Sequence, residues 1–179
     1  MAELTRLEII KLNAIRGENN LNLAGVNLEG IDLQNLYLTK SNLEEANLYK
    51  SNLEEANLEG AYLYRTNLKE ANLEGTNLKK ANLYKTNLER ADLVGANLSG
   101  GNLSGANLSG ANLRFANLTK TIVLNPNWIE RLKDLKVIGY EEIKDKYMVV
   151  DTGKKTGSGK VIYQLELRKP KRIMIPRTL

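Results

Sequence analysis

The chain has 179 residues, a formal net charge of +5, and neither cysteine nor histidine. This length predicts a single domain or one domain with a small appendage. The missing cysteines exclude disulfides and thiolate chemistry, and the missing histidines remove the commonest general base and metal ligand. We therefore expect a protein that is not an enzyme and that binds neither a metal nor a cofactor.

The first segment, residues 1–20, predicts a short amphipathic helix over 2–16 that stops at Gly17. Its apolar side is expected to hold Leu4, Leu7, Ile10, Ala14 and Ile15. Charged residues interrupt the segment, so it lacks the core of a signal peptide, and no stretch of the chain reaches the ~20 apolar residues of a membrane span. These features favour a cytoplasmic protein. A helix this short is marginal alone in water, so we expect it to pack on the rest of the chain.

The second segment, residues 21–121, repeats every five residues. Twenty leucines follow one another at this spacing from Leu23 to Leu118, and an asparagine precedes almost every one. A period of five matches neither a helix nor an ordinary strand. If each unit forms one short side and a corner, four units close a square, and twenty units make five coils stacked at ~4.8 Å. The leucines would fill the interior, and the asparagines would form ladders of side-chain amides.

The position two residues before each leucine also points inward. It carries bulky residues in the first four units, namely Leu21, Val26, Ile31 and Leu36, and only Ser, Ala, Thr or Gly afterwards. We expect the N-terminal helix to cap this first coil, because the terminal units of a repeat array need cover. At the corners, glycines such as Gly95 predict type II turns. Corners without glycine, such as Glu44-Glu45, Lys79-Lys80 and Glu89-Arg90, predict type I-like turns.

The units read as Ala56-Asn57-Leu58-Glu59-Gly60, Ala91-Asp92-Leu93-Val94-Gly95 and Ala106-Asn107-Leu108-Ser109-Gly110. This pattern resembles the pentapeptide-repeat family, and it departs from the family pattern where Tyr37 and Tyr62 replace Asn or Asp. The resemblance implies an all-β solenoid, a right-handed quadrilateral β-helix. It also implies a protein of the kind common in cyanobacteria, where few members have an assigned biochemistry and the roles proposed are mostly protein interaction.

The third segment, residues 122–179, predicts a small α+β cap. Four elements are expected in it: a helix over 128–136, a helical turn over 141–146, and strands over 147–151 and 161–167 that form a β-hairpin. Asn127 and Glu130 predict a capping box at the start of the first helix. The hairpin loop, Gly153 to Lys160, superficially resembles a phosphate-binding loop. It has Lys154 and Val161 where that motif needs Gly and Ser or Thr, and it precedes a strand, so a solvated loop is favoured.

Two hypotheses of function follow. Stepping by twenty residues gathers aromatic and charged side chains, Glu44 and Glu45 among them, in a mixed patch on one face, and such patches are enriched in protein interfaces. This candidate protein-binding face consists of Tyr62, Tyr64, Arg65, Tyr84 and Lys85. The leading interpretation is a non-catalytic scaffold or protein-interaction module, expected to be monomeric because its ends are capped and to bind a protein that the sequence does not identify.

The alternative is a nucleic-acid-associated protein that contacts phosphates through its basic C-terminal segment. The candidate contacts are Arg168, Lys169, Lys171, Arg172 and Arg177, although a solvated tail also explains them. Some members of the family that the repeats resemble mimic DNA and bind gyrase, but those are strongly acidic. Residues 21–120 carry ten basic and eleven acidic groups, so DNA mimicry is not expected.

Overall fold

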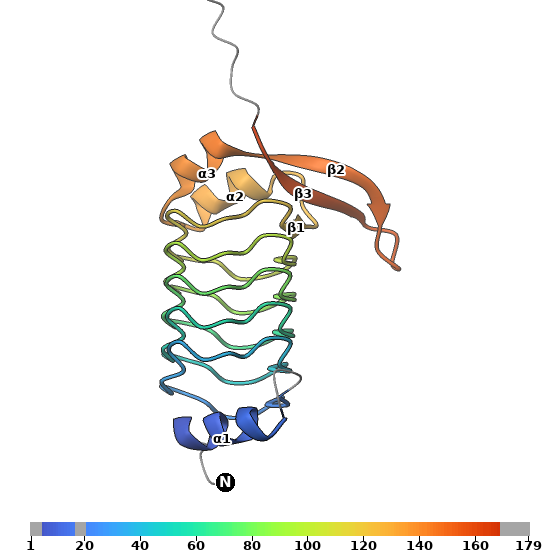
Figure 1. Cartoon of the computed structure of the whole chain (residues 1–179). Coiled ribbons are helices and arrows are strands. Elements are labelled where there is room, and N and C mark those ends of the chain that lie inside the picture. The colour runs from blue at the N-terminus through green and yellow to red at the C-terminus, as the bar shows by residue number, and fades with distance from the viewer. Residues whose placement is uncertain (1–4, 17–20, 169–179) are drawn as a thin grey trace, which may run out of the picture.

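The repeats form stacked coils of twenty residues each. The computed structural model describes residues 5–16 and 21–168. Parallel bridges join residues twenty apart along the whole array, from Asn22 with Asn42 to Asn102 with Ile122. Figure 1 shows the coils stacked into a prism, with helix α1 (Arg6–Arg16) at one end and the C-terminal elements at the other. The coil length therefore matches the one that the leucine spacing predicts.

The interior of the prism is a column of leucines packed against small residues. Leu48, Leu68 and Leu88 stand one above another and are fully buried. The threonines at the small inward positions also link the coils, because their hydroxyls donate to carbonyls of the coil below. Thr66 Oγ1, for example, donates to the Leu43 carbonyl at 2.7 Å and Thr76 Oγ1 to the Leu53 carbonyl at 2.8 Å. The packing thus satisfies these buried hydroxyls, as buried polar groups require.

The predicted asparagine ladders are confirmed. Asn47 Nδ2 donates to Asn27 Oδ1 and Asn67 Nδ2 to Asn47 Oδ1, both at 2.8 Å. The same side chains also shape the corners, because Asn Oδ1 accepts from the backbone N–H two residues further on, as Asn42 Oδ1 does from Glu44 at 3.0 Å. Each asparagine can therefore serve both the coil below and its own turn.

The predicted type I-like corners are wrong. Glu45, Lys80 and Arg90 have φ of 58°, 57° and 56°, in the same left-handed region as Gly95 at 66°. A type I turn has negative φ at this position, so these corners are type II-like. Stacking explains why they adopt it: the Glu45 N–H donates to the Tyr64 carbonyl of the next coil at 2.9 Å. The backbone bonds between coils impose the conformation that glycine adopts freely.

Helix α1 lies across the open end of the first coil (Figure 1), but with a different face than the one predicted. Ile9 is fully buried in the core, whereas Leu7 is 58% and Ile10 38% exposed. The side chains of Leu4, Ala14 and Ile15 lie outside the described residues. The helix begins with a capping box that the sequence analysis missed: the Thr5 N–H donates to Glu8 Oε2 at 2.7 Å, and this bond with that of the Thr5 hydroxyl lowers the pKa of Glu8.

Within the described residues, no coil lies beneath the first coil, and Arg6 of α1 supplies hydrogen-bond donors that such a coil would otherwise supply. Its guanidinium donates to the carbonyls of Asp32 at 3.0 Å and Gln34 at 2.9 Å, and lies 3.3 Å from the Asp32 carboxylate. One coil higher, the equivalent carbonyls of Asn52 and Glu54 accept from backbone N–H groups of the coil below. One side chain of α1 thus satisfies two acceptors at the open end of the array.

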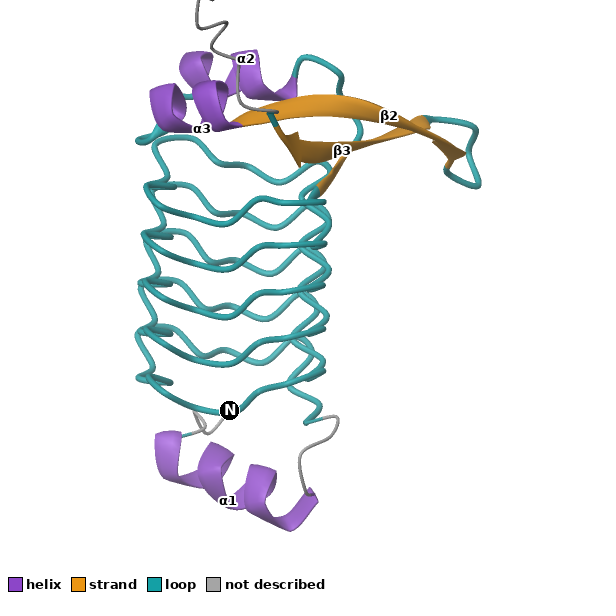
Figure 2. Cartoon of the chain, turned by 45° about the horizontal axis from the view of Figure 1, so that its top comes forward, coloured by secondary structure: helices purple, strands orange, loops and turns teal. Residues whose placement is uncertain are grey.

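The C-terminal elements cover the other end. Helices α2 (Trp128–Asp134) and α3 (Tyr140–Lys146) are followed by strands β2 (Tyr147–Lys155) and β3 (Val161–Leu167), which pair antiparallel. A short strand that was not predicted, β1 (Ile122–Val123), pairs with β3 and completes a sheet of order β1-β3-β2. Figures 1 and 2 show the tip of the β2–β3 hairpin extending beyond the wall of the prism.

The predicted capping box of α2 is not formed. Asn127 occupies the N-cap position, but its side chain makes no capping hydrogen bond. The Asn127 N–H instead donates to Asn125 Oδ1 at 2.8 Å, within the turn that precedes the helix. Asn125 therefore fixes the turn that leads into α2. Its side chain takes the Asn127 N–H that the predicted capping box would have paired with Glu130, because a side chain two residues away forms this bond more readily.

Candidate interaction surface

The stacked rings of Tyr64 and Tyr84 form the centre of the candidate face. Their centroids lie 5.8 Å apart with 15° between the ring planes. The Arg65 guanidinium lies 5.2 Å from the Tyr64 centroid, and Lys85 Nζ lies 5.2 Å from the Tyr84 centroid. We call these four residues the tyrosine ladder. Both cations are within the ~6 Å range of a cation–π interaction, so each ring is covered by its own neighbour in sequence.

The coil geometry explains why the ladder forms. Tyr64 and Tyr84 are twenty residues apart, hence at the same corner of successive coils, and Arg65 and Lys85 follow them in the left-handed corner position. Glu45 lies one coil below Arg65, twenty residues earlier, and its Oε1 is 3.4 Å from Arg65 Nη1. Other charged residues pair by the same rule: Glu89, 2.9 Å from Lys69 Nζ, raises the pKa of that lysine above its usual value. The period thus aligns side chains into vertical rows.

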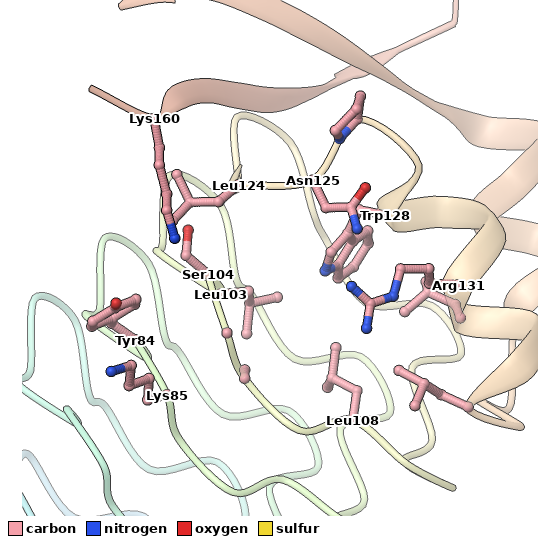
Figure 3. A pocket seen from close by; sticks show the side chains of 15 residues that line it. Tyr84, Lys85, Leu103, Ser104, Leu108, Leu124, Asn125, Trp128, Arg131 and Lys160 are labelled. Atoms are coloured by element: carbon pink, nitrogen blue, oxygen red, sulfur yellow. The ribbon is translucent and has the colours of Figure 1, made fainter. Parts of the chain in front are cut away.

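A pocket of about 460 Å³ opens where this row of corners meets the C-terminal cap (Figure 3). Tyr84 and Lys85 line it together with residues of the last coil, of α2 and of the hairpin loop. Its polar and aromatic lining includes Ser104, Trp128, Arg131 and Lys160, and none of the described residues that line it carries a carboxylate. The sequence analysis missed this pocket, because the distant segments that form it meet only through the cap.

The repeat pattern also decides to which family the chain belongs. The profile of the family described as pentapeptide repeats matches eight copies, over residues 22–60, 56–93 and 86–123. The chain belongs to the pentapeptide-repeat family. Members of this family fold as right-handed quadrilateral β-helices and are generally non-catalytic repeat proteins. The first statement agrees with the coils of twenty residues, and the second agrees with the expectation of a non-catalytic protein.

Solved structures of pentapeptide-repeat proteins resemble this chain. The crystal structure of Rfr23 from the cyanobacterium Cyanothece 51142 is 33% identical, covers 73% of this chain and 97% of its own, and has a TM-score of 0.54. HetL, a protein involved in heterocyst differentiation regulation in the cyanobacterium Nostoc sp. strain PCC 7120, is 30% identical, with coverages of 66% and 74% and a TM-score of 0.47. A comparison with curated protein sequences gave no match.

Tyr62 interrupts one of the family's asparagine ladders and stands apart from the tyrosine ladder. It is 50% exposed and occupies an asparagine position between Asn42 and Asn82. Those two asparagines each accept from the backbone N–H two residues ahead, at 3.0 and 3.3 Å. A tyrosine has no oxygen placed to make this bond. The structure therefore brings together four of the five predicted residues of the face, while Tyr62 has no ring or cation contact with them.

Replacing Tyr62 with asparagine should stabilise the protein. The new amide would accept from the Tyr64 N–H and join the row of Asn42 and Asn82, and each net hydrogen bond is worth about 1 kcal/mol. We expect the free energy of unfolding in urea to rise by roughly 1 kcal/mol. Tyr62→Ala is the matched control, since it removes the ring without supplying an amide, and it should give no such gain. Equal stabilities for the two variants would show that the amide does not rejoin the ladder.

The predicted basic contact is only partly within the described chain. Arg168 is used internally: its backbone N–H donates to the Lys146 carbonyl at 2.9 Å and its Nε to the Lys144 carbonyl at 3.0 Å. These bonds tie the end of β3 to α3. The other four predicted residues, Lys169, Lys171, Arg172 and Arg177, lie outside the described residues.

Two further kinds of feature concern residues 5–16 and 21–168, namely metal ligands and membrane spans. No group of three or more acidic side chains is placed to hold a metal ion in that part of the chain. None of its helices combines the length and apolar character of a membrane span.

Proposed function

We propose that this pentapeptide-repeat protein is a non-catalytic interaction module that binds a protein partner through the tyrosine ladder. The observation that carries the proposal is the stacked pair Tyr64–Tyr84, with a cation over each ring. Aromatic residues and arginine dominate the energetics of protein interfaces. Their concentration at one corner of the prism supports this corner as the contact.

The ladder is ordered before any partner arrives. Its rings stack on each other, and the backbone that carries them is bonded to the coils above and below, as in the Arg65 N–H to the Tyr84 carbonyl at 3.1 Å. Binding normally costs free energy for fixing side chains at an interface, and pre-ordered rings avoid much of that cost. A rigid face of this kind suits a scaffold that holds its partner without changing shape.

The charges at the ladder indicate the partner's chemistry. Arg65 is paired with Glu45, whereas Lys85 makes no ion pair with a described carboxylate. A partner would therefore present an apolar or aromatic centre to the rings and an acidic group near Lys85.

We also propose that the protein acts as a monomer, since α1 and the C-terminal elements cover the two ends of the prism at which coils could otherwise pair.

A double substitution tests the proposal. Tyr64→Ala with Tyr84→Ala should leave the thermal unfolding transition nearly unchanged, because both rings lie outside the leucine core. Tyr49→Ala is the matched control: Lys50 lies 5.1 Å from the Tyr49 ring centroid, but that ring has no stacked neighbour among the described residues. In affinity purification from the native cell, wild type and Tyr49→Ala should recover the same protein partner.

The double variant should bind that partner at least about 30-fold more weakly, as expected for an interface hot spot worth 2 kcal/mol or more. Calorimetric titration with the purified partner measures this ratio. Unchanged affinity of a folded double variant would show that the ladder is not the contact. Recovery that a nuclease abolishes would also contradict the proposal and favour the alternative, a phosphate contact by the basic segment.

A further inference from the structure

The backbone of the last coil leaves two donors unpaired at the pocket. In each lower coil the upward N–H groups donate to carbonyls of the coil above, as Lys85 does to Ser104 at 3.1 Å and Leu88 to Asn107 at 2.8 Å. Their equivalents in the last coil are Gly105 and Leu108, both of which line the pocket. Neither N–H has a hydrogen-bond partner among the described residues.

The C-terminal elements satisfy the other upward donors of the top level. Carbonyls of Ile122, Leu135, Ile138 and Leu165, the hydroxyl of Tyr147 and the carboxylate of Glu142 all accept from them. The Gly110 N–H, for instance, donates to the Leu135 carbonyl and the Leu113 N–H to the Ile138 carbonyl, both at 2.8 Å. The two donors without a partner therefore mark a specific gap in the cap, and the pocket occupies that gap.

A buried hydroxyl and three cations surround the same gap. Ser104 is 3% exposed, and its Oγ has no hydrogen-bond partner in the part of the chain that the structure describes. Lys85, Arg131 and Lys160 line the pocket, and none of them makes an ion pair with a described carboxylate. Figure 3 shows the Ser104 hydroxyl and the end of the Lys160 side chain on one side of the pocket, with Arg131 on the other. Unpaired N–H groups beside several cations form a site for an anion.

The remaining lining is apolar. Leu103, Leu124, Leu132 and the indole of Trp128 line the pocket, whose volume of about 460 Å³ falls in the range of small-molecule sites. In the coil below, the Thr86 carbonyl accepts from the Asn107 N–H at 3.0 Å. The equivalent Ala106 carbonyl has no donor among the described residues and would accept from a ligand hydroxyl or a water. We propose that the pocket binds a small aromatic molecule that carries a phosphate or carboxylate group, with the anion at the Gly105 and Leu108 N–H groups and with Lys160 and Arg131 reaching it from opposite sides of the pocket.

This inference goes beyond the proposed function, and its test uses residues outside the tyrosine ladder. Trp128 is the only tryptophan of the chain, so its fluorescence reports on the pocket alone. We would titrate the full chain with phenyl phosphate and follow Trp128 emission together with the amide ¹H–¹⁵N signals of Gly105 and Leu108. Emission and both amides should change with one saturation curve, and the amide protons should move downfield as they donate to the anion.

Paired ligands and paired variants make the test decisive. Benzyl alcohol and inorganic phosphate should each bind at least about tenfold more weakly than phenyl phosphate, since each lacks one half of the recognised molecule. Arg131→Gln with Lys160→Gln should weaken phenyl phosphate by about tenfold or more, because each removes a charge-assisted contact. Lys133→Gln with Lys155→Gln, on the same helix and hairpin but outside the lining, should change nothing.

Several results would overturn the assignment. Equal binding of benzyl alcohol would remove the role of the anion, and equal binding of inorganic phosphate would remove the role of the ring. A change in Trp128 emission without movement of the Gly105 and Leu108 amides would show that the unpaired donors are not used. A capped peptide carrying one phosphotyrosine, if it bound tenfold more tightly than phenyl phosphate, would assign the pocket to a protein partner in place of a small molecule.

Discussion

Replacing Leu68 with alanine should cost roughly 3–5 kcal/mol of unfolding free energy, the upper part of the range for buried leucines. Leu68 is fully buried in the middle of the prism, with Leu48 and Leu88 fully buried directly below and above it. The cost of such a substitution depends on how far the surroundings can close the cavity. Here parallel bridges hold Asn67 to Asn47 and Asn87, so neighbouring coils cannot approach one another.

Urea unfolding measures the Leu68→Ala effect, with an unchanged m-value indicating that the unfolded state is unaltered. Leu167→Ala is the matched control, because Leu167 ends β3 and is 50% exposed. We expect that variant to lose no more than about 0.5 kcal/mol, as is usual for surface positions. A loss below about 2 kcal/mol for Leu68→Ala would mean that the coils do collapse around the missing side chain.

Replacing Ile9 with aspartate should release α1 from the first coil. Ile9 is fully buried against that coil, and an isolated carboxylate cannot be buried there without a large desolvation cost. We expect a loss of roughly 2–4 kcal/mol, comprising the burial of the side chain and part of the packing around it. The released helix would uncover Val26, Ile31 and Leu36 together with the carbonyls that Arg6 satisfies.

An uncovered end is a template for pairing with another chain, so the Ile9→Asp variant should also self-associate. Sedimentation velocity at increasing protein concentration would detect this, with the wild-type protein run alongside. Ile10→Asp provides the control, since Ile10 is the adjacent residue of the same helix but is 38% exposed. If both variants behave alike, Ile9 does not anchor the cap.

The sequence predicts the central array well because the same five-residue unit occurs twenty times, and each position of the unit meets the same burial and hydrogen-bonding requirements every time. The leucine period determines the coil length, and the regular asparagines determine the ladders, so both could be read without any distant contact. The corner at Glu45 could not, because local preference there favours negative φ and only the bonds between coils reverse it. Local propensity is overridden wherever the stack fixes the backbone.

The candidate site was predictable in part for the same reason. A step of twenty residues places Tyr64 beside Tyr84, but it does not separate them from Tyr62, which lies two positions earlier in the same unit and takes no part in the stack. The pocket was beyond sequence reasoning. The pocket lies where the C-terminal elements leave N–H groups of the last coil without a partner among the described residues. Residues 122–168 have no repeat, so their path over the last coil cannot be predicted from a period in the sequence.

The twenty-residue coil has a consequence for how such a chain can change its length. Inserting four units would add a level and leave every vertical row in register, whereas inserting one unit of five would turn everything above it by a quarter of a revolution. A single extra unit between Arg65 and Ala81 would therefore move Tyr84, Lys85 and the pocket to a different wall from Tyr64. The number of whole coils thus sets the height of the prism, and the number of additional single units sets the wall on which a given side chain lies.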